Sequence, residues 1–206
     1  MFARSTTVMA RPDSVDAGIS YVHDEVMPAL LELAGCIGLS LMVDRQNGRC
    51  IATSAWDSAE AMRDSSDEAD HLRGRTGDRF GGPAGTESWE IAVLHRQHSS
   101  DPGACVRATW ITLPPELTEA GVEYYRSAVL PQIEHLDGFR SASLLVDAES
   151  GRAVSSVSFG SREAMQRNRD HASALKAESI RAAGASAVDE DEFELVIAHL
   201  RAPELV

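Results

Sequence analysis

The chain contains one sequence module twice, and this duplication constrains its fold more than any other feature. The segment 44–62 returns as 147–165, at an offset of 103 residues. When residues 13–62 are placed on 116–165 without a gap, 17 of 50 positions are identical. Ordinary composition gives about three identities by chance. The 206 residues therefore form two modules of about 100 residues, each within the usual size of a domain.

Each module is predicted to begin with a short strand followed by an amphipathic helix. The strands are expected at residues 6–11 and 106–113, and each is followed by proline, which cannot continue a central strand. Apolar residues then recur at steps of three and four, the period of a helix with one buried face. Pro28 and Pro131 lie inside these patterns, so we expect a kink or a break there. Glycines end both helices, at Gly35 and Gly138.

A hairpin and a second helix follow in each module. Gly48 and Gly151 supply the hairpin turns, because glycine takes positive φ without steric cost. The second helices begin after Ser58 and Ser161, both good N-cap residues. Alternating apolar residues predict a closing strand in each module, around residues 89–95 and 193–199.

The second helix of the first module is expected to end near Gly74. The glycine-rich stretch 74–85 that follows has neither the lysine of a phosphate-binding loop nor a preceding strand, so the sequence does not support nucleotide binding. We expect this stretch to be a mobile lid.

The order of elements is β-α-β-β-α-β in both halves, which is the ferredoxin-like arrangement. We place the first module at residues 1–96, a polar linker at 97–104, and the second module at 105–206. In such a module two helices cover one face of the sheet, and the second copy is the obvious partner for the other face. The predicted fold class is α+β.

The charge and the apolar content of the chain limit which partners and which cellular location we expect. The net charge of −13 repels nucleic-acid phosphates and anionic membrane surfaces, so neither nucleic acid nor membrane is expected as a partner. No apolar run approaches the roughly 18 residues of a transmembrane helix. The first seven residues lack the apolar core of a secretory signal, so a cytoplasmic location is expected. The three cysteines occupy unlike positions in the two modules, which suits reduced thiols better than disulfides or a metal cluster.

The chain resembles the antibiotic biosynthesis monooxygenase family of the dimeric α/β barrel superfamily. The resemblance rests on the element order, on a strand-ending aromatic with a short acidic or polar pair, and on Glu-Ala-Met at the start of the second helix. Those residues are Trp56-Asp57-Ser58 with Glu60-Ala61-Met62, and Phe159-Gly160-Ser161 with Glu163-Ala164-Met165. The resemblance implies two ferredoxin-like modules packed sheet to sheet as an intramolecular dimeric α/β barrel. A further homodimer of this pseudo-dimeric chain is possible on the same grounds.

The resemblance also implies a chemistry. Cofactor-independent oxygenases of this family oxidise electron-rich aromatic rings to quinones in a pocket between sheet and helices. Such a pocket needs a base, polar anchors and aromatic walls, but no cofactor and no metal. The expected partner is a hydrophobic small molecule of aromatic or quinol type. The haem-degrading branch is disfavoured, because the first strands lack its asparagine and Ser66 and Thr76 stand where its tryptophan and histidine are expected.

His71 and His171 are the candidate catalytic bases. Each half places one histidine beside an aspartate in its second helix, and histidine exchanges protons near neutral pH. The alternative interpretation is a solvent-exposed histidine beside a solvated aspartate.

Five further residues are candidates for substrate binding. The hydroxyls of Tyr21 and Tyr124 can anchor a quinone oxygen, or the two rings can simply mark the edge of the core. Trp56 and Phe159 can line a pocket, or pack at the ends of their strands. Asn168 can orient a substrate oxygen, or lie exposed on the surface.

Two other classes of function stay open beside the monooxygenase. A non-catalytic small-molecule-binding or stress-related protein can keep this fold without its chemistry. A cofactor-free isomerase needs the base but not dioxygen.

Overall fold

The computed structural model describes residues 1–98, 103–201 and 203–206 in two compact units. The first unit contains Met1–Trp89 and Glu194–Ala202, and the second contains Glu90–Phe193 and Pro203–Val206. Each unit has its own cluster of buried apolar side chains.

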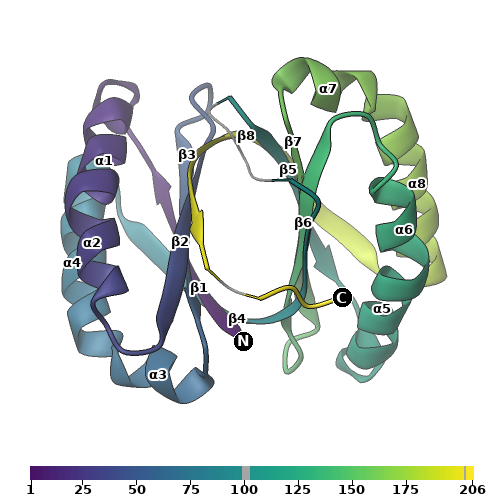
Figure 1. Ribbon diagram of the computed structural model, residues 1–206, viewed down its shortest axis with the longest axis horizontal. Coiled ribbons are helices and arrows are strands. Elements are labelled where there is room, and N and C mark those ends of the chain that lie inside the picture. The colour runs from purple at the N-terminus through teal and green to yellow at the C-terminus, as the bar shows by residue number, and fades with distance from the viewer. Residues whose placement is uncertain (99–102, 202) are drawn as a thin grey trace. The chain divides into compact units, whose positions relative to one another are not determined.

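Three strands of the first unit pair antiparallel in the order β1-β3-β2, and helices cover one face of this sheet (Figure 1). Phe2 lies opposite Trp56 in the ladder of β1 and β3, and Val43 lies opposite Cys50 in the ladder of β2 and β3. The strands are β1 (Phe2–Met9), β2 (Cys36–Val43), β3 (Arg49–Trp56) and the start of β4 (Ala84–Arg96). The helices are η1 (Pro12–Ser14), α1 (Val15–Tyr21), η2 (Val22–Val26), α2 (Met27–Leu31), α3 (Ala59–Asp64) and α4 (Ser66–Phe80).

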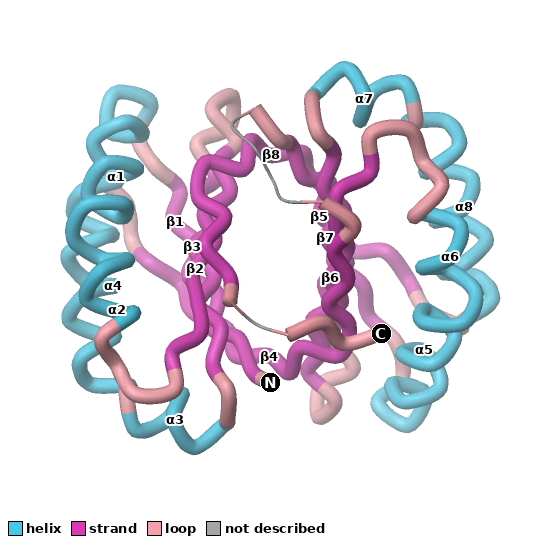
Figure 2. Tube along the Cα trace, viewed as in Figure 1, coloured by secondary structure: helices cyan, strands magenta, loops and turns pink. Residues whose placement is uncertain are grey.

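The second unit repeats this arrangement with the order β5-β7-β6 (Figure 2). Cys105 lies opposite Phe159 in one ladder, and Asp147 lies opposite Arg152 in the other. The strands are β5 (Cys105–Thr112), β6 (Phe139–Asp147), β7 (Arg152–Phe159) and the start of β8 (Ser186–Leu200). The helices are η3 (Pro115–Leu117), α5 (Thr118–Tyr124), η4 (Tyr125–Val129), α6 (Leu130–Ile133), α7 (Arg162–Arg167) and α8 (Arg169–Ala182).

The closing strands β4 and β8 are each shared between the two sheets. Residues 90–96 of β4 pair with β6, and residues 194–200 of β8 pair with β2. Because both strands are shared, the order of hydrogen-bonded neighbours closes on itself as β1-β3-β2-β8-β5-β7-β6-β4, the strand order of a closed barrel. The predicted α+β class, with two ferredoxin-like modules and a barrel strand order, is confirmed.

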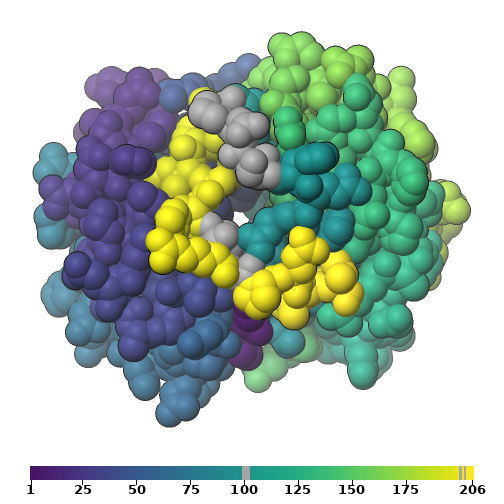
Figure 3. All heavy atoms as spheres, in the orientation of Figure 1, coloured from purple at the N-terminus to yellow at the C-terminus, as the bar shows by residue number. Residues whose placement is uncertain are grey.

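The last residues of the chain lie on the second unit. Leu205 exchanges both backbone hydrogen bonds with Leu94 of β4, each at 2.8 Å. In the space-filling view these C-terminal residues form part of the surface of their own unit (Figure 3). Among the described residues, no helix combines the length and the apolar character that crossing a bilayer requires.

The helices that contain proline do not break, but each changes its hydrogen-bonding pattern just before the proline. The Met27 N–H bonds to the carbonyl of Val22, and the Leu130 N–H to that of Tyr125, both five residues back. These are π-helical turns. Proline has no N–H for the carbonyl four residues earlier, and the wider turn accommodates that loss.

The local turn and cap predictions are confirmed. Gly48 and Gly151 have φ of +77° and +68° in the hairpin turns. The hydroxyls of Ser58 and Ser161 accept hydrogen bonds from the amides of Ala61 and Ala164, at 3.1 and 3.2 Å. Gly35 and Gly138, where both first helices were predicted to end, also have positive φ.

The predicted glycine-rich lid is wrong. Helix α4 continues through Gly74 to Phe80, and β4 begins at Ala84. A helical glycine costs only about 1 kcal/mol, and the end of α4 is anchored by Phe80, which is 1% exposed. Gly77 is needed for packing, because a Cβ there would lie 2.9 Å from the carbonyl oxygen of Gly82.

Candidate functional site

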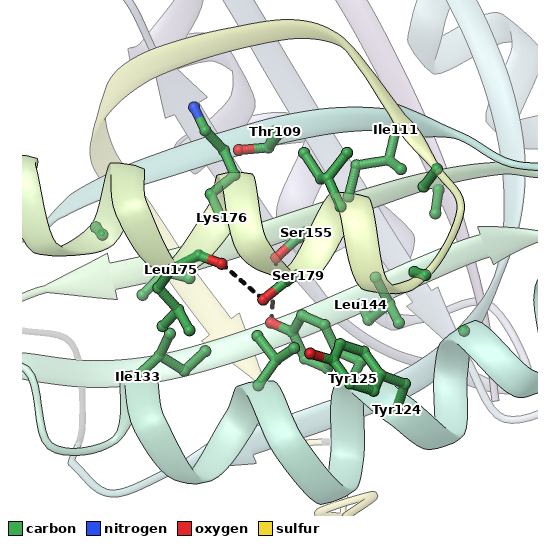
Figure 4. A pocket seen from close by; sticks show the side chains of 18 of the residues that line it. Thr109, Ile111, Tyr124, Tyr125, Ile133, Leu144, Ser155, Leu175, Lys176 and Ser179 are labelled. Carbon is green, nitrogen blue, oxygen red and sulfur yellow. Dashed lines mark hydrogen bonds between the residues drawn. The ribbon is translucent and has the colours of Figure 1, made fainter.

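A cavity of about 130 Å³ lies in the second unit, between its sheet and its helices. Strands β5, β6 and β7 supply one wall, and α5, η4 and α8 supply the other (Figure 4). Most of the lining side chains are apolar, among them Ile111, Val129, Ile133, Leu144, Val157 and Phe159. A dry apolar cavity of about 150 Å³ accommodates benzene, so this space can hold one aromatic ring of a larger ligand.

Phe80 explains why the cavity of the second unit is larger than the equivalent cavity of the first. Phe80 ends α4, and its ring packs so closely on Gly18 that a Cβ at that glycine would lie 2.3 Å from it. At the offset of 103 residues, Ala183 stands at the position of Phe80 and Gly121 at that of Gly18. Ala183 and Gly121 both line the second cavity. The equivalent cavity of the first unit has a volume of only about 30 Å³.

Two hydroxyls form a hydrogen-bonded pair among the apolar side chains of the cavity. The Tyr125 hydroxyl lies 3.1 Å from Ser155 Oγ. Figure 4 shows the labelled Tyr125 and Ser155 side chains in the cavity. Burial raises the pKa of Tyr125 to about 12, while the hydrogen bond with Ser155 acts in the opposite direction. The phenol is therefore neutral at physiological pH and can donate to a ligand oxygen. The first unit has Val22 and Ala52 at these two positions.

Charged groups occupy another part of the lining. Lys176 forms an ion pair with Glu190, and Thr109 Oγ1 donates to the same carboxylate at 3.1 Å. Arg107 donates to Glu192 at 2.9 Å. Of the described residues that line the cavity, Glu190 alone carries a carboxylate.

Two buried polar atoms of the lining have no hydrogen-bond partner. They are Arg107 Nη1 and Thr118 Oγ1, in residues that are 8% and 5% exposed. Unpartnered donors of this kind are costly in a folded protein, and a ligand that carries oxygen can satisfy them.

Of the residues predicted to bind substrate, Tyr124 and Phe159 line the second cavity. Tyr21 and Trp56 belong to the core of the first unit. The Tyr21 ring lies beneath the guanidinium groups of Arg75 and Arg79, at 5.5 and 5.2 Å. The Trp56 indole donates to Ser54 Oγ at 3.0 Å.

The other predicted site residues lie away from the cavity lining. His71 on α4 and His171 on α8 are both exposed to solvent. Asn168 is 8% exposed, and its Nδ2 donates to the carbonyls of Asp137 and Ala164, each at 2.8 Å. The catalytic and binding roles of these three residues stay predictions.

Four polar residues of the cavity are not predicted from the sequence: Tyr125, Ser155, Lys176 and Glu190. A signal for three residues in the cavity was available. A comparison of the repeats shows where the second module departs from the first, at Val22/Tyr125, Ala52/Ser155 and Phe80/Ala183. Such departures report function better than the shared residues here, because the shared residues maintain the fold.

The chain is similar along its whole length to two proteins of Mycobacterium tuberculosis. It is 59% identical to Rv2557 over 206 residues, which cover 100% of the chain and 92% of that protein. It is 56% identical to Rv2558 over 207 residues, which cover 100% of the chain and 88% of that protein. No protein-family model matches the chain.

Solved structures share the fold at low sequence identity. An anthrone oxidase-like protein matches with a TM-score of 0.67 and 12% identity, covering 100% of this chain and 94% of that one. A monooxygenase-like protein of Listeria innocua matches with a TM-score of 0.55 and 10% identity, covering 93% of both chains. A ferredoxin-fold protein of Listeria monocytogenes related to antibiotic biosynthesis monooxygenases matches with a TM-score of 0.52 and 9% identity, covering 95% of both.

Proposed function

The chain belongs to the family of the mycobacterial proteins Rv2557 and Rv2558, and we propose that it is a cofactor-independent monooxygenase of the antibiotic biosynthesis monooxygenase type. Its substrate would be a hydrophobic aromatic or quinol-type molecule held in the cavity of the second unit. The observation that carries this proposal is the apolar, ring-sized cavity with one buried hydroxyl pair, Tyr125 and Ser155. An anthrone oxidase-like protein and monooxygenase-like proteins among the structural neighbours support the choice of chemistry.

The cavity offers the groups that such an oxidation needs. The Tyr125 hydroxyl donates to a ring oxygen of the substrate, while the apolar walls exclude water. Glu190 accepts a proton from an activated ring CH₂, and the resulting carbanion reacts with dioxygen. One oxygen atom becomes the new carbonyl and the other leaves as water with the two ring hydrogens, so the reaction balances without a cofactor.

Oxygen uptake with anthrone as the test substrate examines this proposal. Glu190→Gln is expected to lower kcat by about 10²–10⁴-fold, the usual contribution of a general base. Tyr125→Phe is expected to raise KM, because it removes the hydroxyl that anchors the substrate. Absence of anthrone-dependent oxygen uptake by the wild type would contradict the proposal.

The histidines predicted from the sequence are tested in the same assay. His71→Ala and His171→Ala remove exposed side chains that do not line the cavity. Loss of activity in either variant, with Glu190→Gln still active, would assign the base to that histidine instead. Retained activity in both, with loss in Glu190→Gln, supports the carboxylate.

One observation favours a second candidate, a binding protein without turnover. Glu190 is paired with Lys176 and accepts a hydrogen bond from Thr109, and both contacts stabilise its charged form and weaken it as a base. A protein of this kind would show a ligand-dependent rise in melting temperature with no oxygen uptake. A cofactor-free isomerase would instead convert its substrate equally well without oxygen.

A further inference from the structure

The small cavity of the first unit contains a buried arginine with an unused donor. Arg4 is 7% exposed, and its Nη2 donates to the carbonyl of Met62 and, at 3.1 Å, to Ser66 Oγ. Its Nη1 is buried and has no partner. The guanidinium also lies over the Trp56 ring, 5.9 Å from its centroid. None of these contacts supplies a negative charge.

A second arginine lines the same cavity. The Arg73 side chain is 17% exposed and pairs with Asp70, whose own side chain is 64% exposed. Burial lowers the pKa of Arg73, and the positive charge of Arg4 lowers it further. Burial likewise lowers the pKa of Arg4. Two like charges thus line one cavity, and the carboxylate of the exposed Asp70 pairs with Arg73.

The second unit neutralises the equivalent charges. Arg107, the counterpart of Arg4, is paired with Glu192 at 2.9 Å. The closing strands correspond at an offset of 104 residues, because His95 pairs with Ala142 where His199 pairs with Leu39. Ser88 therefore stands at the position of Glu192 in the first unit and carries no charge. The duplication therefore kept the buried arginine and removed its carboxylate.

We propose that the cavity of the first unit binds a compact monovalent anion between Arg4 and Arg73. A buried charge without a partner is costly, and an anion on Arg4 Nη1 supplies both the missing charge and the missing hydrogen bond. The volume of about 30 Å³ exceeds the roughly 10–15 Å³ that one water requires. The anion is therefore of the size of chloride, nitrate or formate. Formate represents the carboxylate of a small organic acid, and the other two represent free inorganic ions.

Thermal unfolding of the full chain at constant ionic strength tests the proposal. Gluconate is the reference anion, because it is too large for the cavity, and it is replaced stepwise by chloride, nitrate or formate. The melting temperature of the wild type is expected to rise and then saturate with at least one of them, since a ligand that binds only the folded state stabilises it. A preference for formate over both inorganic ions would indicate an organic acid as the natural occupant.

The matched variants separate a site from a general salt effect. Arg4→Met and Arg73→Met are each expected to lose at least four-fifths of the anion-dependent shift. Arg63→Met, which removes an exposed arginine of the same unit, should keep the whole shift. Equal shifts in all four proteins, or no difference between gluconate and the small anions, would overturn the proposal.

A measurement on the wild type alone covers the case in which Arg4→Met does not fold. Binding to a protein site broadens the chloride resonance in ³⁵Cl NMR, and displacement by nitrate or formate should sharpen it again. A line width that the protein does not change would also overturn the proposal.

Discussion

At the scale of the residue, single side chains decide which half of this duplicated chain has the larger cavity. Ala183 leaves open the space that Phe80 fills in the first unit. Tyr125 and Ser155 then place two hydroxyls in that space. Helices α4 and α8 are both followed by a glycine of positive φ, Gly81 and Gly184.

The burial of Tyr125 predicts a tyrosine that titrates far above its ordinary pKa. Its pKa is about 12 in the folded protein, because burial disfavours the phenolate. The folded state therefore holds this proton between pH 10 and 12 while the unfolded state releases it. The contribution of Tyr125 to the free energy of unfolding is fully present below pH 10. Above pH 10 it decreases by up to about 1.4 kcal/mol per pH unit.

Absorbance of the phenolate near 295 nm measures this directly. One of the three tyrosines should ionise near pH 12 in the folded wild type, and that step should be missing in Tyr125→Phe. A wild type whose tyrosines all ionise near pH 10 while it is still folded would contradict the buried hydrogen-bonded phenol.

At the scale of the element, the sequence predicts those features that depend only on residues close together in the chain. The turns at Gly48 and Gly151 and the caps at Ser58 and Ser161 follow from local backbone chemistry, and all four are where the sequence predicts them. The end of α4 was misjudged, because packing of Phe80 outweighs the weak helix propensity of Gly74.

The cavity was harder to predict, since it depends on which face of a helix points inward. The cavity-lining residues of α8 recur at helical steps as Ala172, Leu175, Lys176 and Ser179. His171 lies one residue away from this stripe and is exposed. His171 is a candidate because of its chemistry. The sequence alone predicts which way a helical side chain points only when the apolar pattern of the helix is strong. The pattern of α8 is weak.

The caps of α3 and α7 give a prediction at this scale. Ser58→Ala and Ser161→Ala each remove the acceptor for an amide at the start of a helix, so each should lower the free energy of unfolding by about 1 kcal/mol. Chemical denaturation measures the change, and Ser→Asp at the same positions is the control that should keep most of the stability. An alanine variant as stable as the wild type would show that the cap contributes nothing.

At the scale of the whole molecule, duplication has allowed two similar units to diverge in their interiors. The first unit encloses about 30 Å³ beside two arginines, and the second encloses about 130 Å³ with apolar walls. The identities between the modules maintain the turns, caps and cores, while the differences create two unlike cavities. A chain of this kind can bind two different ligands without any change of fold.

Filling the cavity of the second unit shows whether that cavity is the ligand site. Ala183→Phe copies the residue that fills the first unit, and Gly121 is available to receive the ring as Gly18 does. Overpacking typically costs about 1–3 kcal/mol, so the variant should fold. Ala177→Phe adds the same ring at an exposed position of α8 and is the matched control.

The measurement is calorimetric titration of the wild type and both variants with anthrone under nitrogen, so that binding is observed without turnover. Wild type and Ala177→Phe are expected to bind alike, and Ala183→Phe should bind at least about tenfold more weakly, the loss that corresponds to 1.4 kcal/mol. A folded Ala183→Phe variant that binds anthrone as tightly as the wild type would contradict the account.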